Sequence, residues 1–334
     1  MVDISVVVPF HNAGHTLARC LESVAAVSDG SMEVILVDDG STDGSSGIAR
    51  GFSYRLLGLT EKSGAAVARN RGAAEARGEY LLFLDADVVL RLDTIRVLRD
   101  TFRQRPEIAA VGGVYSDRPL LPGLFQEFKA LESAYNYSRY RTDRYSAFDT
   151  HCSMVRRDSF FELGGFPESY RGADVEDVHF GRLLAERYVN CINPAAVVDH
   201  HYSRYWSGLE KYLRRTFYWV RLFLAGPQFD EAVTTRHNAL SVLLAGCTVA
   251  AAALGIWHGA ALWVAGVLLA AFVLWNCGFW RGVVVRRGWR ALWKVPVFLL
   301  YLFTLQVAVA VGAAGGLIWW SLRPASLRRG SRHS

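Results

Sequence analysis

The first 200 residues alternate short apolar runs with segments of helical periodicity. Three runs rich in branched apolar residues predict buried strands: Ile4–Val8, Glu33–Val37 and Tyr80–Leu84. Pro9 is expected to end the first strand, and Asn12 to cap a helix with apolar positions from Leu17 to Val24. Further helices are expected at Gly64–Ala76 and Leu92–Leu98. This order predicts an α/β fold with a mostly parallel sheet covered on both faces.

The pattern continues less regularly after residue 120. An aromatic and basic segment, Pro122–Arg144, precedes an extended segment over Ala147–Val155. A turn at Gly164–Pro167, a helix from Val175 and a strand over Ala195–Val198 follow. Because ligands of parallel sheets bind beyond the carboxyl ends of the strands, the polar residues that follow each strand form the candidate site.

Long apolar runs dominate the last hundred residues. Three of them reach the ~20 residues that a bilayer-spanning helix needs: Ala239–Trp257, Ala261–Trp280 and Val295–Trp320. Before them, Tyr205–Leu224 mixes aromatic and basic side chains, which is typical of a helix in the membrane interface. We therefore expect a catalytic domain over residues 1–203, an interfacial region over 204–235, and a transmembrane region of two or three helices with a basic tail over 236–334.

Charge is distributed unevenly along the chain. Ten of the 37 basic residues lie beyond Glu231, the last acidic residue, so the first 231 residues carry a net charge of −4. Trp257–Ala260 has no Lys or Arg and Arg281–Lys294 has five, so the positive-inside rule predicts a transmembrane hairpin with cytoplasmic ends. If Val295–Trp320 also spans, the basic tail lies outside, against that rule. Its Gly312–Gly316 stretch could instead break a re-entrant or interfacial segment, although length favours a third span.

Several classes of function are disfavoured. No G-x-G-x-x-G follows the first strand and no Walker A sequence occurs, which argues against dinucleotide oxidoreductases and P-loop enzymes. The first half has no basic cluster interleaved with aromatic residues, which argues against nucleic-acid binding. The five cysteines lack metal-ligand spacing, so neither a zinc site nor a disulfide framework is expected. The start of the chain shows no cleavable signal.

Carboxylates follow two of the predicted strands. Asp85 and Asp87 close Tyr80–Leu84, and residues at i and i+2 of an extended chain point to one face. Two oxygen donors on one side suit a hard divalent ion that also binds a diphosphate. The alternative is a pair of turn aspartates before a helix. Asp39 follows the neighbouring strand, either in a tight turn or as an acceptor for a nucleotide base or ribose.

Two further groups could carry chemistry. Asp174 and Asp177 fit a capping arrangement at the start of a helix, whereas Glu176 or Asp177 could instead be the general base for an acceptor hydroxyl. His200 and His201 follow a strand, and one of them could offer an imidazole to a metal. A lone histidine is more often a structural residue.

Linked motifs recur in a characteristic order. They are VVVPFHN at residues 6–12, VDDGSTD at 37–43, GAAVARNRG at 64–72 and GEYLLFLDAD at 78–87, continued by VRR at 155–157, GGFPE at 164–168 and Glu176-Asp177. This order closely resembles the family 2 glycosyltransferases of the GT-A fold, over about residues 3–215. The resemblance implies a Rossmann-like nucleotide-sugar-binding domain with a mixed, mostly parallel sheet, followed here by C-terminal transmembrane helices.

The resemblance assigns the matched residues to three groups. The donor-binding residues would be Pro9 and His11 against the base, Asp39 bonded to the base, Asp85 near the ribose, and Arg69. The metal-binding residues would be Asp87 with either His200 or His201. The catalytic base would be Asp177, with Glu176 beside it. His151-Cys152 departs from the small residues more usual in the family, which leaves the sugar or acceptor pocket open.

The implied reaction is the inverting, Mn²⁺- or Mg²⁺-dependent transfer of one hexose from a nucleotide sugar, with a UDP-sugar favoured. The acceptor would be a membrane lipid or lipid-linked glycan of the cell envelope. The Gln-x-x-Arg-Trp element of processive synthases is absent. We expect a multi-pass protein of the inner cell membrane with a cytoplasmic catalytic domain. The alternatives are a nucleotidyltransferase, which would release pyrophosphate, and a non-catalytic membrane scaffold with a degenerate site.

Overall fold

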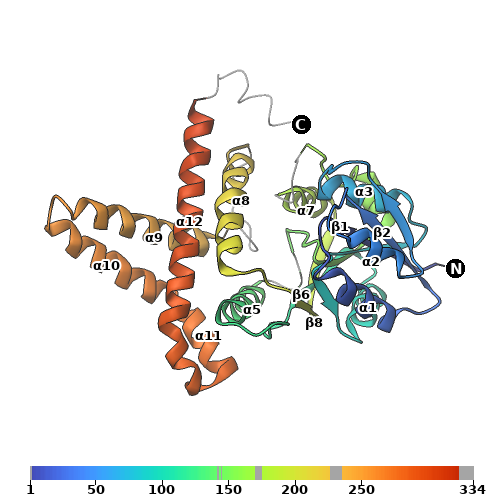
Figure 1. Cartoon of the computed structure of the whole chain (residues 1–334), viewed down its shortest axis with the longest axis horizontal. Coiled ribbons are helices and arrows are strands. Elements are labelled where there is room, and N and C mark those ends of the chain that lie inside the picture. Colours follow the sequence, from blue (N-terminus) through green and yellow to red (C-terminus); the bar gives the residue numbers. More distant parts are fainter. Residues whose placement is uncertain (1, 141–142, 144, 170–174, 226–234, 323–334) are drawn as a thin grey trace. The chain divides into compact units, whose positions relative to one another are not determined.

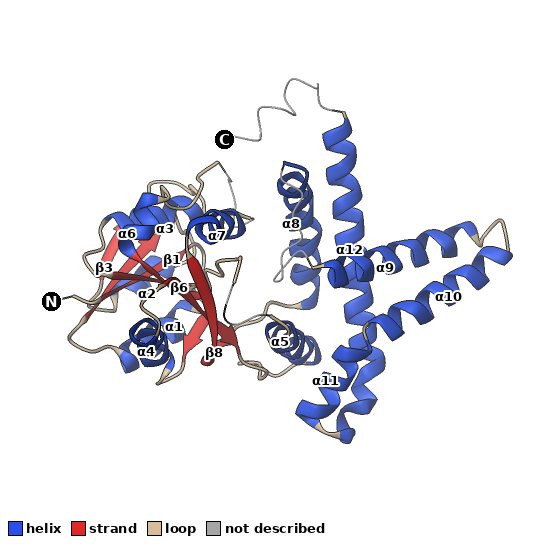
Figure 2. Cartoon of the chain, turned by 180° about the vertical axis from the view of Figure 1, so that it is seen from behind, coloured by secondary structure: helices blue, strands red, loops and turns tan. Residues whose placement is uncertain are grey.

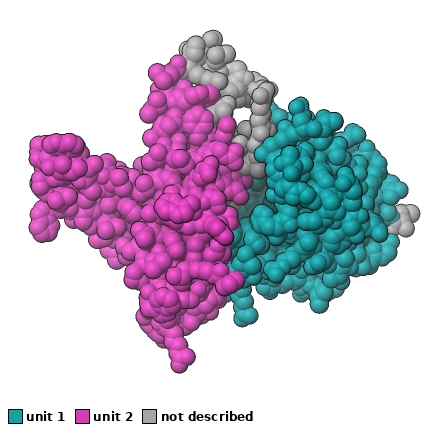
Figure 3. Space-filling model, in the orientation of Figure 1, with its two compact units in different colours: residues 1–121, 136–202 teal, residues 122–135, 203–334 magenta. Residues whose placement is uncertain are grey.

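The computed structural model describes residues 2–140, 143, 145–169, 175–225 and 235–322. The chain forms two compact units, one of residues 1–121 and 136–202 and the other of residues 122–135 and 203–334 (Figure 3). A short segment from the first half of the chain thus belongs to the unit that holds the C-terminal helices. The domain boundaries expected at residues 203 and 235 stay predictions, because compactness alone does not delimit functional domains.

A mixed sheet forms the middle of the first unit (Figure 1). In the described part of the chain it has eight strands in the order β3-β2-β1-β4-β7-β6-β8-β5. They are β1 Ile4–Phe10, β2 Met32–Asp38, β3 Arg55–Gly58, β4 Tyr80–Leu84, β5 Val88–Leu90, β6 Ile108–Tyr115, β7 Cys152–Arg156 and β8 Val189–His200. β1 to β4 run parallel, and β6 is parallel to β8, while β7 and β5 are antiparallel to their neighbours. The sheet is therefore mixed and mostly parallel, as the sequence predicts.

Helices cover both faces of this sheet (Figure 2). α1 (Leu17–Val27) and α4 (Thr94–Gln104) contribute to one apolar core, while α3 (Ala65–Ala74), α6 (Arg157–Glu162) and α7 (Glu176–Arg187) contribute to the other. Val6 and Val8 of β1 enter the first core and Val7 enters the second, and all three are fully buried. Burial on both faces explains why β1 reads as an unbroken apolar run.

The turn after β1 differs from the expectation. The strand continues past Pro9 to Phe10, still paired with β2. Its pairing with β4 ends at Val7, so at Pro9 the strand has only one neighbour, and proline, which has no N–H to donate, is tolerated there. Asn12 does not cap α1, whose N-cap position is Thr16. Asn12 instead adopts a φ of 51°, and its side-chain oxygen accepts a bond from the Thr42 N–H at 2.8 Å.

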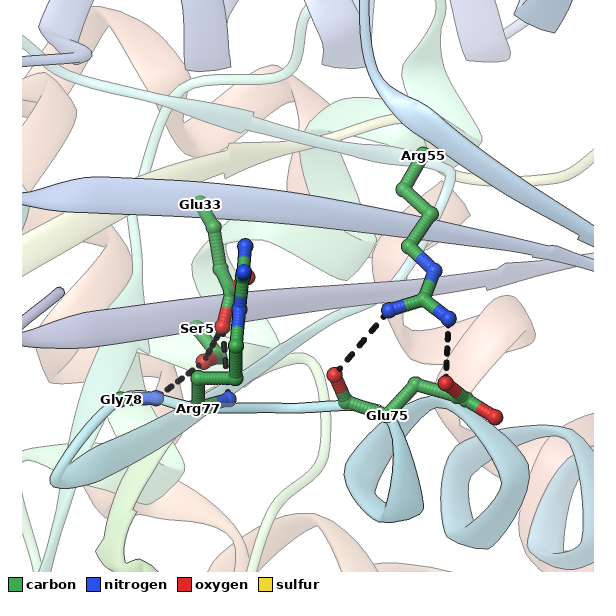
Figure 4. A network of polar contacts seen from close by, with 6 residues as sticks. All are labelled: Ser5, Glu33, Arg55, Glu75, Arg77 and Gly78. Carbon is green, nitrogen blue, oxygen red and sulfur yellow. Dashed lines mark hydrogen bonds and ion pairs between the residues drawn. The ribbon is translucent and has the colours of Figure 1, made fainter.

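A polar network connects the amino-terminal ends of β1, β2 and β4 (Figure 4). The Glu33 carboxylate accepts bonds from the Ser5 hydroxyl at 2.6 Å and from the Arg77 N–H at 2.7 Å. It also pairs with the Arg77 guanidinium at 2.9 Å, and the Gly78 N–H donates to Ser5 Oγ at 2.8 Å. The chain that enters β4 is thereby held at the amino-terminal ends of β1 and β2, which sets the register of the strand that carries Asp85.

The second unit consists of helices in its described residues. They are α5 (Leu124–Tyr137, its last two residues in the first unit), α8 (Tyr205–Ala225), α9 (Arg236–Leu254), α10 (Ala260–Trp275), α11 (Cys277–Arg287), the short 3-10 helix η1 (Trp289–Lys294) and α12 (Val295–Ser321). Phe125, Phe128 and Leu131 of α5 share one core with residues of α9 to α12. A segment that we expected within the catalytic domain is therefore anchored among the C-terminal helices.

Two of the three expected membrane spans take the predicted form. α9 and Trp289–Ser321 are each long and apolar enough to cross a membrane. The run Ala261–Trp280 is not one straight helix, because α10 and α11 meet at a bend of 47° around Asn276. The expected loop Arg281–Lys294 is largely helical, since α11 extends to Arg287 and η1 follows it.

The glycine-rich stretch of the last run is a packing face and not a break. α12 is one continuous helix through Gly312 and Gly316, so the expected alternative of an interruption there is wrong. A Cβ added to Gly312 would lie 2.4 Å from the carbonyl oxygen of Leu213, and one added to Gly316 would lie 3.0 Å from that of Phe217. The two glycines let the backbone of α8 approach α12 closely, as small residues do between membrane helices.

Gly72 offers a test of the contact between α3 and the sheet. A Cβ at this position would lie 2.4 Å from Val7 Cγ1 and 3.1 Å from Val37 Cγ2, two stiff side chains of β1 and β2. Gly72→Ala should therefore destabilise the protein by about 1–3 kcal/mol through overpacking, seen as a lower melting temperature of the purified protein. The control is Gly47→Ala, an exposed helical position with open space, which should not lower it. Equal melting temperatures for the two variants would contradict this packing.

Candidate functional site

Aspartates lie at the carboxyl ends of two parallel strands on either side of β1. Asp38 is the last residue of β2, and Asp85 directly follows β4, with β1 between the two strands. Because these strands run in the same direction, their carboxyl ends share one edge of the sheet, where ligands of open α/β sheets bind. This edge of the sheet is therefore the candidate site, and the roles that the sequence predicts for its residues stay predictions.

Asp39 is engaged by the start of α3. Its side chain is buried, and its two carboxylate oxygens accept the backbone N–H groups of Ser63 at 2.6 Å and Gly64 at 3.0 Å. His11 lies beside it, with Nδ1 2.8 Å from the Asp39 carbonyl oxygen, and donates that bond when protonated at Nδ1. Pro9, half-buried in β1, precedes His11. Asp39 thus connects the turn after β2 to the start of α3. Each carboxylate oxygen can accept more than one hydrogen bond, so these contacts leave Asp39 able to accept a bond from a nucleotide base as well.

Arg69 connects two motifs that lie far apart in the sequence. Its guanidinium donates to Asp85 Oδ1 at 2.8 Å and to Glu176 Oε1 at 2.9 Å, and the residue is 4% exposed. Burial disfavours its charge, but the carboxylates of Asp85 and Glu176 outweigh this and raise the pKa of Arg69. The guanidinium also lies over the Phe166 ring, 5.7 Å from its centroid. The strand end with Asp85 and the helix start with Glu176 are therefore held at one guanidinium.

The start of α7 brings Glu176 and Asp177 to the site in different ways. Glu176 is buried against Arg69, whereas Asp177 is partly exposed and one of its oxygens accepts the Val178 N–H at 2.8 Å. Val175 occupies the N-cap position and makes no side-chain cap bond. Asp174, expected as that cap, lies outside the described residues. Of the two predicted catalytic residues, Asp177 is the one with solvent access.

Aromatic packing fixes α7 on the sheet. Phe180 of α7 contacts Phe166 at 4.9 Å between ring centroids, and Phe166 contacts Phe83 of β4 at 5.0 Å. All three rings are almost fully buried. Phe83 lies two residues before Asp85, so this chain of rings sets the distance between the two carboxylate-bearing elements.

Asp87 lies beside the His200 ring. His200 is the last residue of β8, and its Nε2 is 3.3 Å from Asp87 Oδ2. The expected strand at Ala195–Val198 thus extends further and carries this histidine to the site. The His201 ring packs against His15 at 5.5 Å, while its backbone N–H donates to the Asp87 carbonyl at 2.9 Å. Burial, followed by the charge of His15, lowers the pKa of His201.

Tyr115, part of a largely buried aromatic cluster beside Asp87, escaped the sequence analysis, which named only His151 and His200 of this cluster. Tyr115, at the carboxyl end of β6, stacks on His151 at 4.0 Å and contacts His200 at 4.7 Å. The His151 carbonyl accepts the Asp85 N–H at 3.3 Å. Burial raises the pKa of Tyr115 well above its usual range, helped by Asp85 and Asp87, and burial lowers the pKa of His151. The sequence does show a tyrosine near the end of an apolar run. Only the pairing of β6 with β8 reveals that this tyrosine lies next to His200.

The side chains around Asp87 fit a divalent cation completed by phosphate oxygens. Among the described residues no group of three or more His, Cys, Asp or Glu side chains could hold a metal alone. Asp87 and His200 still supply one oxygen and one nitrogen 3.3 Å apart. Mg²⁺ in nucleotide sites uses one or two carboxylates plus substrate phosphates and water, and imidazole suits transition metals. The donor set thus fits a shared protein–diphosphate site better than a closed metal cage.

Comparison with known proteins gives consistent matches. Residues 5–164 match the model of glycosyl transferase family 2. Glycosyltransferase GlyG of Streptococcus pneumoniae serotype 4 is 36% identical over 118 residues, which cover 34% of this chain and 39% of GlyG. Glycosyltransferase GlyA of the same organism is 30% identical over 193 residues, covering 56% of this chain and 27% of GlyA. The chain thus spans well under half of the length of these two relatives.

A solved structure extends the likeness to the whole fold. The mannosyltransferase PcManGT from Pyrobaculum calidifontis, solved in complex with GDP-Man and Mn²⁺, has a TM-score of 0.59. The match covers 96% of this chain and 88% of PcManGT at 19% sequence identity, so it concerns the fold alone. The family match shows that residues 5–164 carry a family 2 glycosyltransferase domain, and the structural likeness shows the GT-A fold; helices apolar enough to cross a membrane follow this domain in the chain.

Proposed function

We propose that this protein transfers one sugar from a nucleoside-diphosphate sugar to an acceptor hydroxyl, with inversion at the anomeric carbon. The observation that carries the proposal is the double ion pair of Arg69 with Asp85 and Glu176. It joins the Asp-x-Asp strand end, expected to hold the donor diphosphate, to the helix start that carries the expected base. A turn or a cap alone would not require a buried arginine between the two.

The donor would bind at the carboxyl ends of β1, β2 and β4. His11 and the buried Asp39 would receive the base, and a UDP-sugar is the first donor to test. Asp87 and His200 would hold a Mn²⁺ or Mg²⁺ ion against the diphosphate. When bound, that ion supplies charge stabilisation for the leaving nucleoside diphosphate. We assign this place to His200 in preference to His201, whose ring packs against His15.

Asp177 would act as the general base. Its carboxylate would take the proton of the acceptor hydroxyl while that oxygen bonds to the anomeric carbon. The bond from the anomeric carbon to the diphosphate oxygen breaks, and its electron pair leaves with the nucleoside diphosphate. Attack opposite the leaving group inverts the configuration. Arg69 and Glu176, buried against each other, would position Asp85 and α7 for this step without touching the acceptor.

The acceptor is proposed to be a membrane lipid or a lipid-linked glycan, with the catalytic unit on the cytoplasmic face. The chain enters and leaves α5 from the catalytic unit, so we propose that α5 is on the same side of the membrane as that unit. Glu127 of α5 pairs with Lys294 at 2.6 Å and with Arg287 at 3.5 Å. These two cations follow the α9–α10 hairpin, so the ion pairs support a hairpin that returns to the catalytic side, as the positive-inside rule predicts.

Removal of the Asp87 carboxylate tests the metal proposal. Asp87→Ala should lose more than about 10²-fold in sugar transfer, because the charge on the leaving group is no longer offset. Release of UDP, GDP or dTDP from matching sugar donors measures turnover, and EDTA should abolish it in the wild type. Asp93→Ala, at a nearby exposed aspartate, is the control and should keep activity. Transfer that survives both EDTA and Asp87→Ala would exclude a metal-dependent site.

Asp177→Asn tests the base. Asparagine has nearly the same shape and its side-chain oxygen can still accept the Val178 N–H, but it cannot take a proton. Transfer should fall by about 10²–10⁴-fold, while donor binding measured by calorimetry stays within a few-fold of the wild type. Asp158→Asn, another first-turn aspartate, should have no such effect. A fully active Asp177→Asn would move the base to another carboxylate.

Single-cysteine labelling tests the membrane arrangement. In a cysteine-free background, a membrane-impermeant thiol reagent applied to intact cells should label Gly259→Cys between α9 and α10, and should not label Arg290→Cys. Opening the cells should expose Arg290→Cys, which controls for reactivity. The reverse pattern would place the catalytic unit outside. Labelling of Ser331→Cys in intact cells is expected if α12 crosses the membrane.

A further inference from the structure

The His200 imidazole is supported in an unusual way for a metal-binding histidine. Such a histidine almost always donates its second ring N–H to a carboxylate, carbonyl or water, which fixes the ring orientation. Nδ1 of His200 is buried and has no hydrogen-bond partner among the residues that the structure describes. Something other than a hydrogen bond to Nδ1 must therefore keep Nε2 directed at Asp87.

Aromatic rings enclose His200. Tyr115 approaches at 4.7 Å with 49° between the ring planes, and Tyr202 approaches edge-on at 4.5 Å. Tyr115 in turn stacks on His151 at 4.0 Å with 28° between the planes. His151 is 4% exposed, and its carbonyl is bonded to the Asp85 N–H. The stack is thus anchored to the strand end that carries the metal-binding aspartate.

The stack is suited to act by shape. The Tyr115 ring contacts both the His151 ring and the His200 ring. Packed rings restrict the rotation of an enclosed imidazole because turning it would displace close-packed neighbours.

We infer that Tyr115, backed by His151, is a positioning residue that holds the His200 imidazole against Asp87 for the divalent cation. The inference rests on the proposed function, because it needs a cation at this pair. It differs from that proposal in assigning the orientation of the ligand to ring packing from β6, a strand that carries no residue of the predicted site.

Mn²⁺ affinity is the direct readout. Purified full-length wild type and variants are titrated with Mn²⁺ in the presence of UDP, and in parallel with GDP, and free Mn²⁺ is measured by electron paramagnetic resonance. Tyr115→Leu should weaken Mn²⁺ binding about tenfold, the lower end of what loss of a ligand's supporting contact costs. Tyr115→Phe keeps the ring and should stay within about twofold. Tyr54→Leu, at a half-buried tyrosine stacked on Phe52, is the matched control and should bind as the wild type does.

A double substitution separates positioning from a general loss of structure. If Tyr115 acts through His200, Tyr115→Leu should add no further weakening of Mn²⁺ binding in a His200→Ala background. Tyr115→Met is made in parallel, because its flexible side chain fills an irregular space without a flat ring. Melting curves identify which of the two variants folds as the wild type does. An equal further loss in the His200→Ala background would overturn the inference.

The remaining outcomes distinguish this inference from the proposed function. Suppose that the wild type transfers sugar and binds Mn²⁺, and that a folded Tyr115→Leu or Tyr115→Met variant binds Mn²⁺ with the same affinity. This result overturns only the role of Tyr115. A wild type that binds no Mn²⁺ with either nucleotide overturns both the cation site and its positioning. Weakened binding in Tyr115→Phe as well would assign the effect to the hydroxyl and would also overturn positioning by the ring.

Discussion

The candidate site is organised around the buried guanidinium of Arg69, which is bonded to Asp85 at the end of β4 and to Glu176 at the start of α7. A buried charge is tolerated only when its partners are in place, and removal of one partner leaves an uncompensated charge that typically costs 3–5 kcal/mol. The three side chains are therefore mutually dependent. α7 cannot shift relative to β4 without breaking a buried ion pair, and this constraint brings Asp177 to the edge that carries Asp87.

Sheet topology supplies the other half of the site. β8 runs parallel to β6 and antiparallel to β5, and its register places His200 opposite Val88, directly after Asp87. The same pairing places Tyr115, at the end of β6, next to Val198. β8, which begins more than a hundred residues after Asp87, thus places the His200 imidazole beside Asp87. Its neighbour β6 places the Tyr115 ring against that imidazole.

In the second unit, close backbone packing and a few ion pairs hold together a mostly apolar set of helices. α8 carries aromatic and basic side chains, and it packs against α12 where Gly312 and Gly316 leave room for its backbone. α5 adds apolar rings to the same core, while Glu127 pairs with cations at the end of α11 and in η1. Charged groups near a bilayer are stabilised by pairing, and these pairs tie a segment from the first half of the chain to the C-terminal helices.

The sequence by itself determined the alternation of strands and helices, the strand-end aspartates and the apolar runs, because each depends on local periodicity and turn chemistry. It did not reveal that Arg69 joins Asp85 to Glu176, that the His200 ring pairs with Asp87, or that Tyr115 packs beside them, because these contacts depend on the pairing of β6 with β8 and on the packing of α7 against the sheet. The bend at Asn276 and the fit of α8 on Gly312 likewise escaped it. Burial and register are properties of the packed chain, and only the tertiary structure decided them.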